Sequence, residues 1–158
     1  MVALVVALTL AVLSSPAPAQ VPSGPLTIHV EAVLEPIRVK VVRTVFSVNG
    51  TAGLAGLIEG QSEVSGFYDL IDRSDVAPLP LGEPIPIVSG NISGGPLVEP
   101  VHVTCTGMLD DAGNGSGQCA VHGEVEGRGT WAGRADPQGR FLTLDIYSQV
   151  VCPRCASR

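Results

Sequence analysis

The stretch Val101–Gly123, VHVTCTGMLDDAGNGSGQCAVHG, is almost a mirror image about Ala112. Directly opposed residues of an antiparallel hairpin have a constant index sum, and one such sum pairs Cys105 with Cys119 and His102 with His122. The centre of the stretch, residues 110–117, consists of Asp, Ala, Gly, Asn and Ser, most of which favour turns or positive φ. The sequence therefore predicts a β-hairpin that a cross-strand disulfide between Cys105 and Cys119 would lock.

Alternation of apolar and polar residues extends this hairpin into a four-strand meander that ends at Val151. Turns are expected around Glu126–Arg128 and at 136–139, where Asp-Pro-Gln-Gly suits a type I turn. A three-residue connection sets Trp131 opposite Gly123, and a two-residue last turn sets Trp131 opposite Leu144. One face then carries Val101, Val103, Cys105, Cys119, Val121, Trp131, Leu142, Leu144 and Ile146. The other carries His102, Thr104, His122, Glu124, Thr130, Arg134, Thr143, Asp145 and Tyr147.

The segment that precedes this meander also has the pattern of strands. Leu26–Leu34 alternates cleanly, and Pro36 is expected to end that strand. In Ile37–Val48 the alternation changes phase near Val41, which a β-bulge or a strand buried on both faces would explain. Asn49–Gly50 predicts a turn.

Two further strands and a long loop are expected between Thr51 and Pro100. Thr51–Gly60 is rich in glycine and is interpreted as a bent strand, and Glu63–Ile71 as a regular one. Ser74–Pro100 contains six prolines, so at most a short edge strand, Ile85–Ile92, is expected there. We interpret residues 74–100 as a proline-rich loop on a single domain, with a linker between two domains as the alternative.

The composition agrees with an all-β protein. The chain has 19 Gly and 13 Pro, only 4% aromatic residues, and no long stretch with helical periodicity after its N-terminal segment. Short β segments broken by Gly and Pro are typical of sandwiches and small barrels. The predicted fold is an antiparallel small β-barrel or sandwich that ends in a four-strand meander.

Residues 1–19 are expected to form a cleaved signal peptide. Val2–Leu13 is an uncharged apolar run too short to cross a bilayer, and Ala17-Pro18-Ala19 suits signal peptidase cleavage before Gln20. No Lys or Arg precedes the run, so either the signal is weakly charged or the true start lies upstream. Residues 20–158 contain no second apolar stretch of spanning length, so we expect a secreted or periplasmic protein without a membrane span.

The four cysteines of an exported chain are expected to form two disulfides. The hairpin symmetry favours Cys105–Cys119, which leaves Cys152–Cys155, although the two other pairings stay open. Cys152-Pro153-Arg154-Cys155 has the spacing of a redox pair, but only three residues follow it, too few for the helix that lowers such a thiol's pKa. A structural disulfide is the preferred interpretation.

The polar face of the meander supplies the candidate ligand-binding residues His102, His122, Glu124, Asp145 and Tyr147. A joint zinc site with the cysteines is disfavoured, because His102 and Cys105 point to opposite faces of a strand. A half-site of His102 and His122, helped by Glu124 or Asp145, is the remaining metal hypothesis, and a plain cross-strand histidine pair is preferred. No metal, cofactor or catalytic residue is therefore assigned.

The charge pattern excludes one class of function and leaves three. The net charge is −6, and one Lys and eight Arg are scattered along the chain, which argues against nucleic-acid binding. The preferred hypothesis is a non-enzymatic binding module for a small ligand or for a protein or glycan partner outside the cell or in its envelope. The alternatives are a β-barrel enzyme that uses the His102/His122 face and a structural component of the cell envelope.

Overall fold

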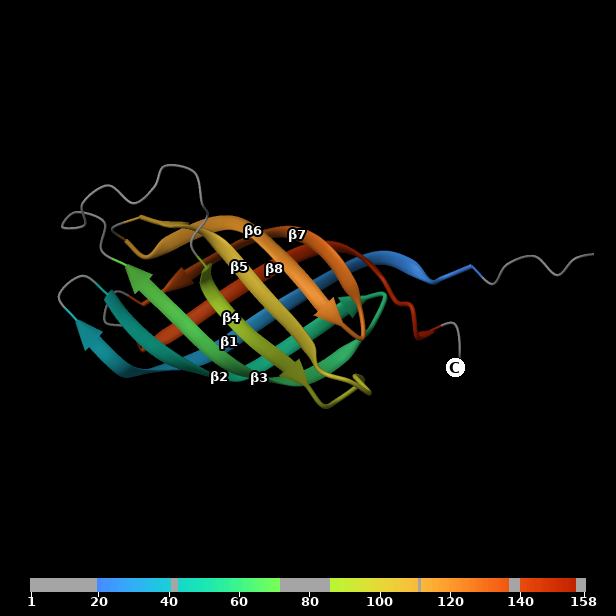
Figure 1. Ribbon diagram of the computed structural model, residues 1–158, viewed down its shortest axis with the longest axis horizontal. Helices are drawn as coiled ribbons and strands as arrows, with labels where there is room; N and C mark the ends of the chain where they lie inside the picture. The colour runs from blue at the N-terminus through green and yellow to red at the C-terminus, as the bar shows by residue number, and fades with distance from the viewer. Residues whose placement is uncertain (1–19, 41–42, 72–85, 111, 137–139, 156–158) are drawn as a thin grey trace, which may run out of the picture.

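The computed structural model describes residues 20–40, 43–71, 86–110, 112–136 and 140–155 (Figure 1). Eight antiparallel strands follow one another around a closed barrel, and the last pairs with the first. The strands are β1 (Ser23–Lys40), β2 (Arg43–Gly56), β3 (Gly60–Ile71), β4 (Pro86–Ser93), β5 (Val101–Leu109), β6 (Asn114–Gly123), β7 (Glu126–Ala135) and β8 (Phe141–Val151). The predicted all-β fold is confirmed, and of its two forms the chain adopts the barrel. The described part of the chain contains no apolar helix of membrane-spanning length.

The hairpin of β5 and β6 has the register that the mirror symmetry predicts. Cys105 lies opposite Cys119 and His102 opposite His122, and the first pair forms a disulfide. The turn is organised by Asp110, whose carboxylate accepts hydrogen bonds from the backbone N–H groups of Ala112 (2.9 Å) and Asn114 (2.8 Å). These hydrogen bonds lower the pKa of Asp110, the larger contribution coming from Asn114.

Downstream of the hairpin, the predicted faces are right but the predicted registers are wrong. Trp131 lies opposite Gly117 and Ile146, where the sequence analysis placed Gly123 and Leu144. The chain reverses at Glu124–Val125, so Glu126–Arg128 begins β7 and is no turn. Both shifts are by an even number of residues, which leaves every side chain within the strands on its predicted face. All nine residues of the predicted apolar face are buried.

Three predictions for β1 and β2 were wrong. β1 continues past Pro36 through an irregularity between Pro36 and Arg38. Lys40 pairs with Arg43, so the chain passes from β1 to β2 between these residues. This change of strand accounts for the phase change near Val41, and neither the β-bulge nor the strand buried on both faces is its cause. Asn49–Gly50 lies inside β2, where a Cβ on Gly50 would stand 2.0 Å from the carbonyl oxygen of Glu31. Here glycine allows two strands to approach closely, as it does at the corners of small barrels.

β4 lies within the segment predicted as a proline-rich loop. It pairs with β3 on one side and with β5 on the other, so it is not the edge strand that the prolines suggested. A closed barrel has no edge strands, and Pro86 is accommodated as the first residue of β4. The rest of that segment before Pro86 and the turn predicted at 136–139 fall largely outside the described residues, as does the predicted signal peptide at residues 1–19.

Apolar side chains fill the barrel and cover one of its ends. The inward residues of all eight strands belong to one buried cluster. At the end where β1 begins and β8 ends (Figure 1), each of the three connections adds one buried apolar residue to that cluster: Ile58, Leu97 and Val125. We call this the closed end.

The C-terminal residues are tied to the closed end. Cys152, which is fully buried, forms the expected disulfide with Cys155 and donates its backbone N–H to the Pro22 carbonyl at 2.8 Å. Arg154 makes an ion pair with Glu99 of the connection between β4 and β5. The Cys152–Cys155 disulfide therefore lies among contacts that join the segments flanking β1 and β8 to the barrel.

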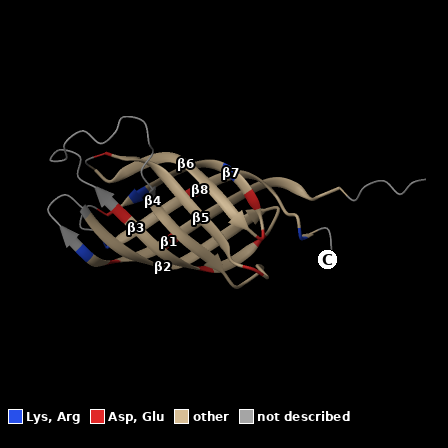
Figure 2. Ribbon diagram, in the orientation of Figure 1, with Lys and Arg blue, Asp and Glu red and all other residues tan. Residues whose placement is uncertain are grey.

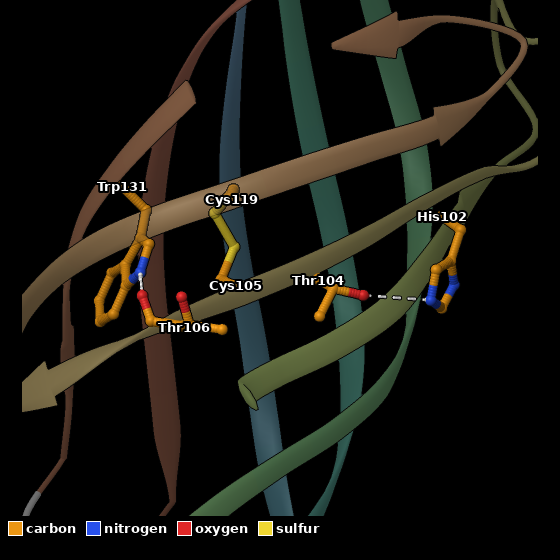
Figure 3. Close-up of a disulfide and its surroundings, with 6 residues drawn as sticks. All are labelled: His102, Thr104, Cys105, Thr106, Cys119 and Trp131. Carbon is orange, nitrogen blue, oxygen red and sulfur yellow. Dashed lines mark hydrogen bonds between the residues drawn. A yellow bond between two sulfur atoms is a disulfide. The ribbon is translucent and has the colours of Figure 1, made fainter. Parts of the chain in front are cut away.

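The buried indole of Trp131 lies beside the Cys105–Cys119 disulfide (Figure 3). Its Nε1–H donates to the Thr106 carbonyl at 2.8 Å. Cβ atoms added at Gly107, Gly115 and Gly117 would stand 2.7–2.9 Å from indole atoms. Three glycines of one hairpin thus form a cradle for the ring, which we call the glycine cradle.

Candidate functional site

The structure separates the five candidate ligand-binding residues into three places. His102 and His122 are exposed neighbours on β5 and β6. Asp145 and Tyr147 lie on β8, which β7 separates from β6. Glu124 is buried at the closed end of the barrel. The five residues therefore do not form one cluster.

His102 lies among neutral polar side chains. Its Nδ1 is 3.0 Å from Asn91 Oδ1, and its Nε2 is 3.3 Å from Thr104 Oγ1 and 3.4 Å from Ser89 Oγ. Figure 3 shows His102 near the start of β5, away from the buried disulfide. These contacts satisfy both ring nitrogens with neutral groups, as expected for a structural histidine on an exposed sheet face.

Glu124 does not lie on the polar face that the sequence predicted. Its carboxylate accepts hydrogen bonds from the backbone N–H groups of Val98 (2.7 Å) and Glu99 (3.0 Å), and the residue is only 1% exposed. The parity argument fails at Glu124 because the residue belongs to the reversal between β6 and β7. Glu124 fastens the connection between β4 and β5 onto the closed end.

Asp145 faces a histidine that the sequence analysis did not select. Asp145 Oδ1 is 2.5 Å from His29 Nδ1, and His29 Nε2 is 3.6 Å from Glu31 Oε1. The hydrogen bond to Asp145 raises the pKa of His29 above its usual value, although partial desolvation opposes this. The alternation of Leu26–Leu34 marks His29 as exposed, but only the pairing of β1 with β8 shows its partner.

The two acidic residues that were expected to assist a metal site at His102 and His122 have other partners. Glu124 is committed to two backbone N–H groups and Asp145 to His29, so neither assists a site at His102 and His122. Among the described residues, no three His, Cys, Asp or Glu side chains gather where they could hold a metal ion. All four cysteines are held in disulfides.

A shallow open hollow of about 290 Å³ lies over β8 and the two strands that flank it. It is lined by Pro25, Leu26, Thr27, Arg128, Gly129, Thr130, Tyr147, Ser148 and Gln149. Leu26 and Ser148 are buried, and the Ser148 hydroxyl donates to the Leu26 carbonyl at 3.2 Å inside the wall. The side chains available to a ligand therefore belong to the outward residues of the lining.

The outward residues of the hollow stand in two rows across three strands. In one row Tyr147 lies between Thr27 of β1 and Thr130 of β7. In the next, Gln149 lies between Pro25 and Arg128. Of the five residues selected from the sequence, only Tyr147 lines this hollow. The lining residues of β1 were missed because β1 meets β8 only when the barrel closes, and those of β7 because Glu126–Arg128 was predicted as a turn and the register of β7 against β8 was wrong by two residues.

Comparison of the chain with protein-family models, with curated proteins and with solved structures gives no match.

The distribution of charged residues bears on what the hollow can bind. Figure 2 shows that the charged residues visible in that view lie mainly toward the two ends of the barrel. The lining of the hollow includes one charged residue, Arg128, and no carboxylate.

Proposed function

We propose that this protein is a non-enzymatic binding module of an oxidising compartment outside the cytoplasm, and that it binds a small ligand on the outer wall of its barrel. The observation that carries the proposal is the hollow over β1, β8 and β7, which combines an aromatic ring with several hydrogen-bonding side chains. Concave sites with an apolar surface and a few convergent polar groups are the usual form of small-molecule sites.

The interior of the barrel is a weaker candidate for the binding site. An eight-stranded barrel is just wide enough for side chains to fill it, or to hold one small ligand. Here Trp131, the Cys105–Cys119 disulfide and large aliphatic residues share the buried cluster. Ile58, Leu97 and Val125 join that cluster from the closed end. Both features favour the outer wall.

The disulfides support the proposed compartment. Both bridges use residues that are buried or partly buried, and they account for every cysteine. Stable disulfides form in the periplasm and in secreted proteins and are rare in the cytosol. The signal peptide expected at residues 1–19 would direct the chain there. Mass spectrometry of the exported protein tests this point, with Gln20 as the expected first residue.

Two arrangements favour binding over catalysis. His102 contacts neutral side chains, whereas a general base is normally oriented by a charged or strongly polar partner. His29 does have a charged partner in Asp145, but this pair, with side chains 48% and 38% exposed, lies outside the hollow. Neither histidine lines the hollow. The polar groups that do line it are suited to hold a ligand.

Nuclear magnetic resonance tests the location of the site without knowledge of the natural ligand. The isotope-labelled chain 20–158, with both disulfides formed, is titrated with a library of small organic fragments. The expected result is a set of amide shifts confined to Thr27, Thr130, Tyr147, Gln149 and their neighbours. Shifts centred on inward residues far from the hollow, such as Val48 and Val103, would instead place the site inside the barrel and overturn the proposal.

A further inference from the structure

We infer that the ligand of the outer-wall hollow is a saccharide, with Tyr147 as the platform for a sugar ring. This inference rests on the proposed function, because it names the ligand class of the same site. It starts from Tyr147, a large aromatic residue that remains 54% exposed at the centre of a polar row. A pyranose ring presents an apolar face of C–H groups, which packs well against an aromatic ring.

The side chains around Tyr147 match the hydroxyl groups of a sugar. Thr27 and Thr130 flank the tyrosine and offer hydroxyls that both donate and accept. Gln149 and Arg128 lie directly opposite each other in the neighbouring row. The amide of Gln149 donates and accepts, and the guanidinium of Arg128 donates in a fork that fits two adjacent oxygens. Sugar hydroxyls are both donors and acceptors, so they can use all four groups.

The size and shape of the hollow limit the ligand to a ring on an open surface. Its volume of about 290 Å³ is just below the usual range of small-molecule sites, about 300–1,000 Å³. The hollow is open to solvent, so neighbouring units of a chain could continue out of it. A closed pocket would favour a free small molecule, whereas an open one also admits one residue of an oligosaccharide.

The charge of the lining requires that the test include both neutral and acidic sugars. Arg128 is the one ionised residue of the hollow, and guanidinium groups bind vicinal hydroxyls as well as carboxylates. Neutral sugars and uronic acids therefore share the chemistry that this site recognises.

Isothermal titration calorimetry of the intact chain 20–158 tests the inference. The probes are cellohexaose, xylohexaose, mannohexaose and chitohexaose as neutral sugars, and hexagalacturonate as an acidic one. We expect at least one of them to bind at micromolar to millimolar concentration. If only hexagalacturonate binds, Arg128→Ala should abolish binding. If none of the five binds at millimolar concentration, the inference is overturned.

Variants on β8 distinguish the contribution of the Tyr147 ring to binding from general effects of substituting an exposed aromatic residue. Tyr147→Ala should weaken binding about tenfold through the loss of ring packing, and Tyr147→Phe by less than about threefold. The matched control is Phe141→Ala, which removes another exposed aromatic residue from the outer face of β8, outside the hollow. It should leave the affinity unchanged. An equal loss in Phe141→Ala, or unchanged affinity in Tyr147→Ala, would move the sugar away from the hollow and contradict the inference.

The same experiments distinguish failure of the inference from failure of the proposed function. If fragments shift the amides of the hollow but no saccharide binds, the wall site stands and its ligand class is wrong. If fragments shift the interior residues instead, the proposed site is wrong and the saccharide inference falls with it.

Discussion

His29 Nδ1 lies 2.5 Å from Asp145 Oδ1 across the pairing of β1 with β8, which closes the barrel. The two residues are separated by 116 positions in the sequence. The hydrogen bond joins the outer faces of the first and last strands, next to the row that contains Tyr147. It is therefore a direct measure of whether the barrel is closed.

The His29–Asp145 pair should make stability depend weakly on pH. Because Asp145 raises the pKa of His29 in the folded state, this contribution is fully present below the unfolded value of 6.5. It is lost as the pH rises through the higher folded value. The two side chains are partly exposed, so the free energy of unfolding should fall by less than about 1 kcal/mol.

Proton titration by nuclear magnetic resonance checks this pair directly. The His29 imidazole should titrate above 6.5 in the wild type and closer to 6.5 in Asp145→Asn. The control is Asn91→Ala, which removes a contact of His102 and should leave the His29 titration unchanged. A His29 pKa that does not respond to Asp145→Asn would show that the hydrogen bond is absent in solution.

The two disulfides should differ in their effect on stability. The Cys105–Cys119 bridge closes a loop of about 15 residues, and its removal should lower the free energy of unfolding by about 3 kcal/mol in the chain-entropy model. The Cys152–Cys155 bridge closes a loop of only about four residues, which corresponds to about 2 kcal/mol. Urea unfolding of the two double Cys→Ala variants measures the difference. A larger loss from the C-terminal pair would contradict the model.

Tyr68 should resist ionisation. Burial raises its pKa to about 12, and its ring lies 5.7 Å from that of Phe46. The unfolded chain ionises this tyrosine near pH 10, so stability is retained below that pH and lost between about pH 10 and 12. The loss should amount to roughly 2–3 kcal/mol. The ultraviolet absorbance of tyrosinate should show a late step that Tyr68→Phe removes and Tyr147→Phe leaves in place.

The sequence predicts those parts of this fold that depend on local pattern. The mirror symmetry around Ala112 predicts the register of β5 and β6, because both strands and their turn lie in one short stretch. The even or odd position of a residue correctly assigns Trp131 and Ile146 to the interior although their registers were wrong. The face of the sheet to which a side chain points is thus predicted more reliably than its cross-strand partner, since any even shift of register leaves the face unchanged.

The candidate site could not be predicted in the same way, because it is assembled by closure. Tyr147 was selected on polarity alone, and its neighbours Thr27 and Arg128 come from strands at opposite ends of the sequence. Asp145 was grouped with two histidines, while its partner is His29 on β1. Local preference also misled at Gly50, where the approach of the Glu31 carbonyl decides the residue type.

The glycine cradle of Trp131 should not tolerate a side chain. A Cβ at Gly107 would lie 2.9 Å from Trp131 Cζ2 and 2.3 Å from the Ser116 carbonyl oxygen. Gly107→Ala should therefore lower the free energy of unfolding by about 1–3 kcal/mol and alter the emission of the single tryptophan. The control is Gly53→Ala in β2, where the nearest atom to the new Cβ is 3.9 Å away. Equal losses in both variants would show that the substitutions act through strand propensity and that the cradle is not involved.

Glu124 should contribute strongly to the stability of the closed end. Its carboxylate accepts two backbone hydrogen bonds from residues 25 and 26 positions away, and Leu97, which precedes them, belongs to the buried cluster. Glu124→Ala would leave the N–H groups of Val98 and Glu99 without this acceptor, at a cost of about 3 kcal/mol. Glu124→Gln keeps an acceptor oxygen and should lose less.

Hydrogen exchange separates this fastening from a general loss of stability. In Glu124→Ala, the amides of Val98 and Glu99 should exchange faster by a larger factor than the amides of β1 and β8, since only the former lose a partner. Glu126→Ala, two residues along and exposed, serves as the matched control and should change neither. If the two variants have the same effect, the burial of Glu124 contributes no more to the barrel than an exposed carboxylate does. A selective response at Val98 and Glu99 would show that the reversal between β6 and β7 holds the connection between β4 and β5 in place.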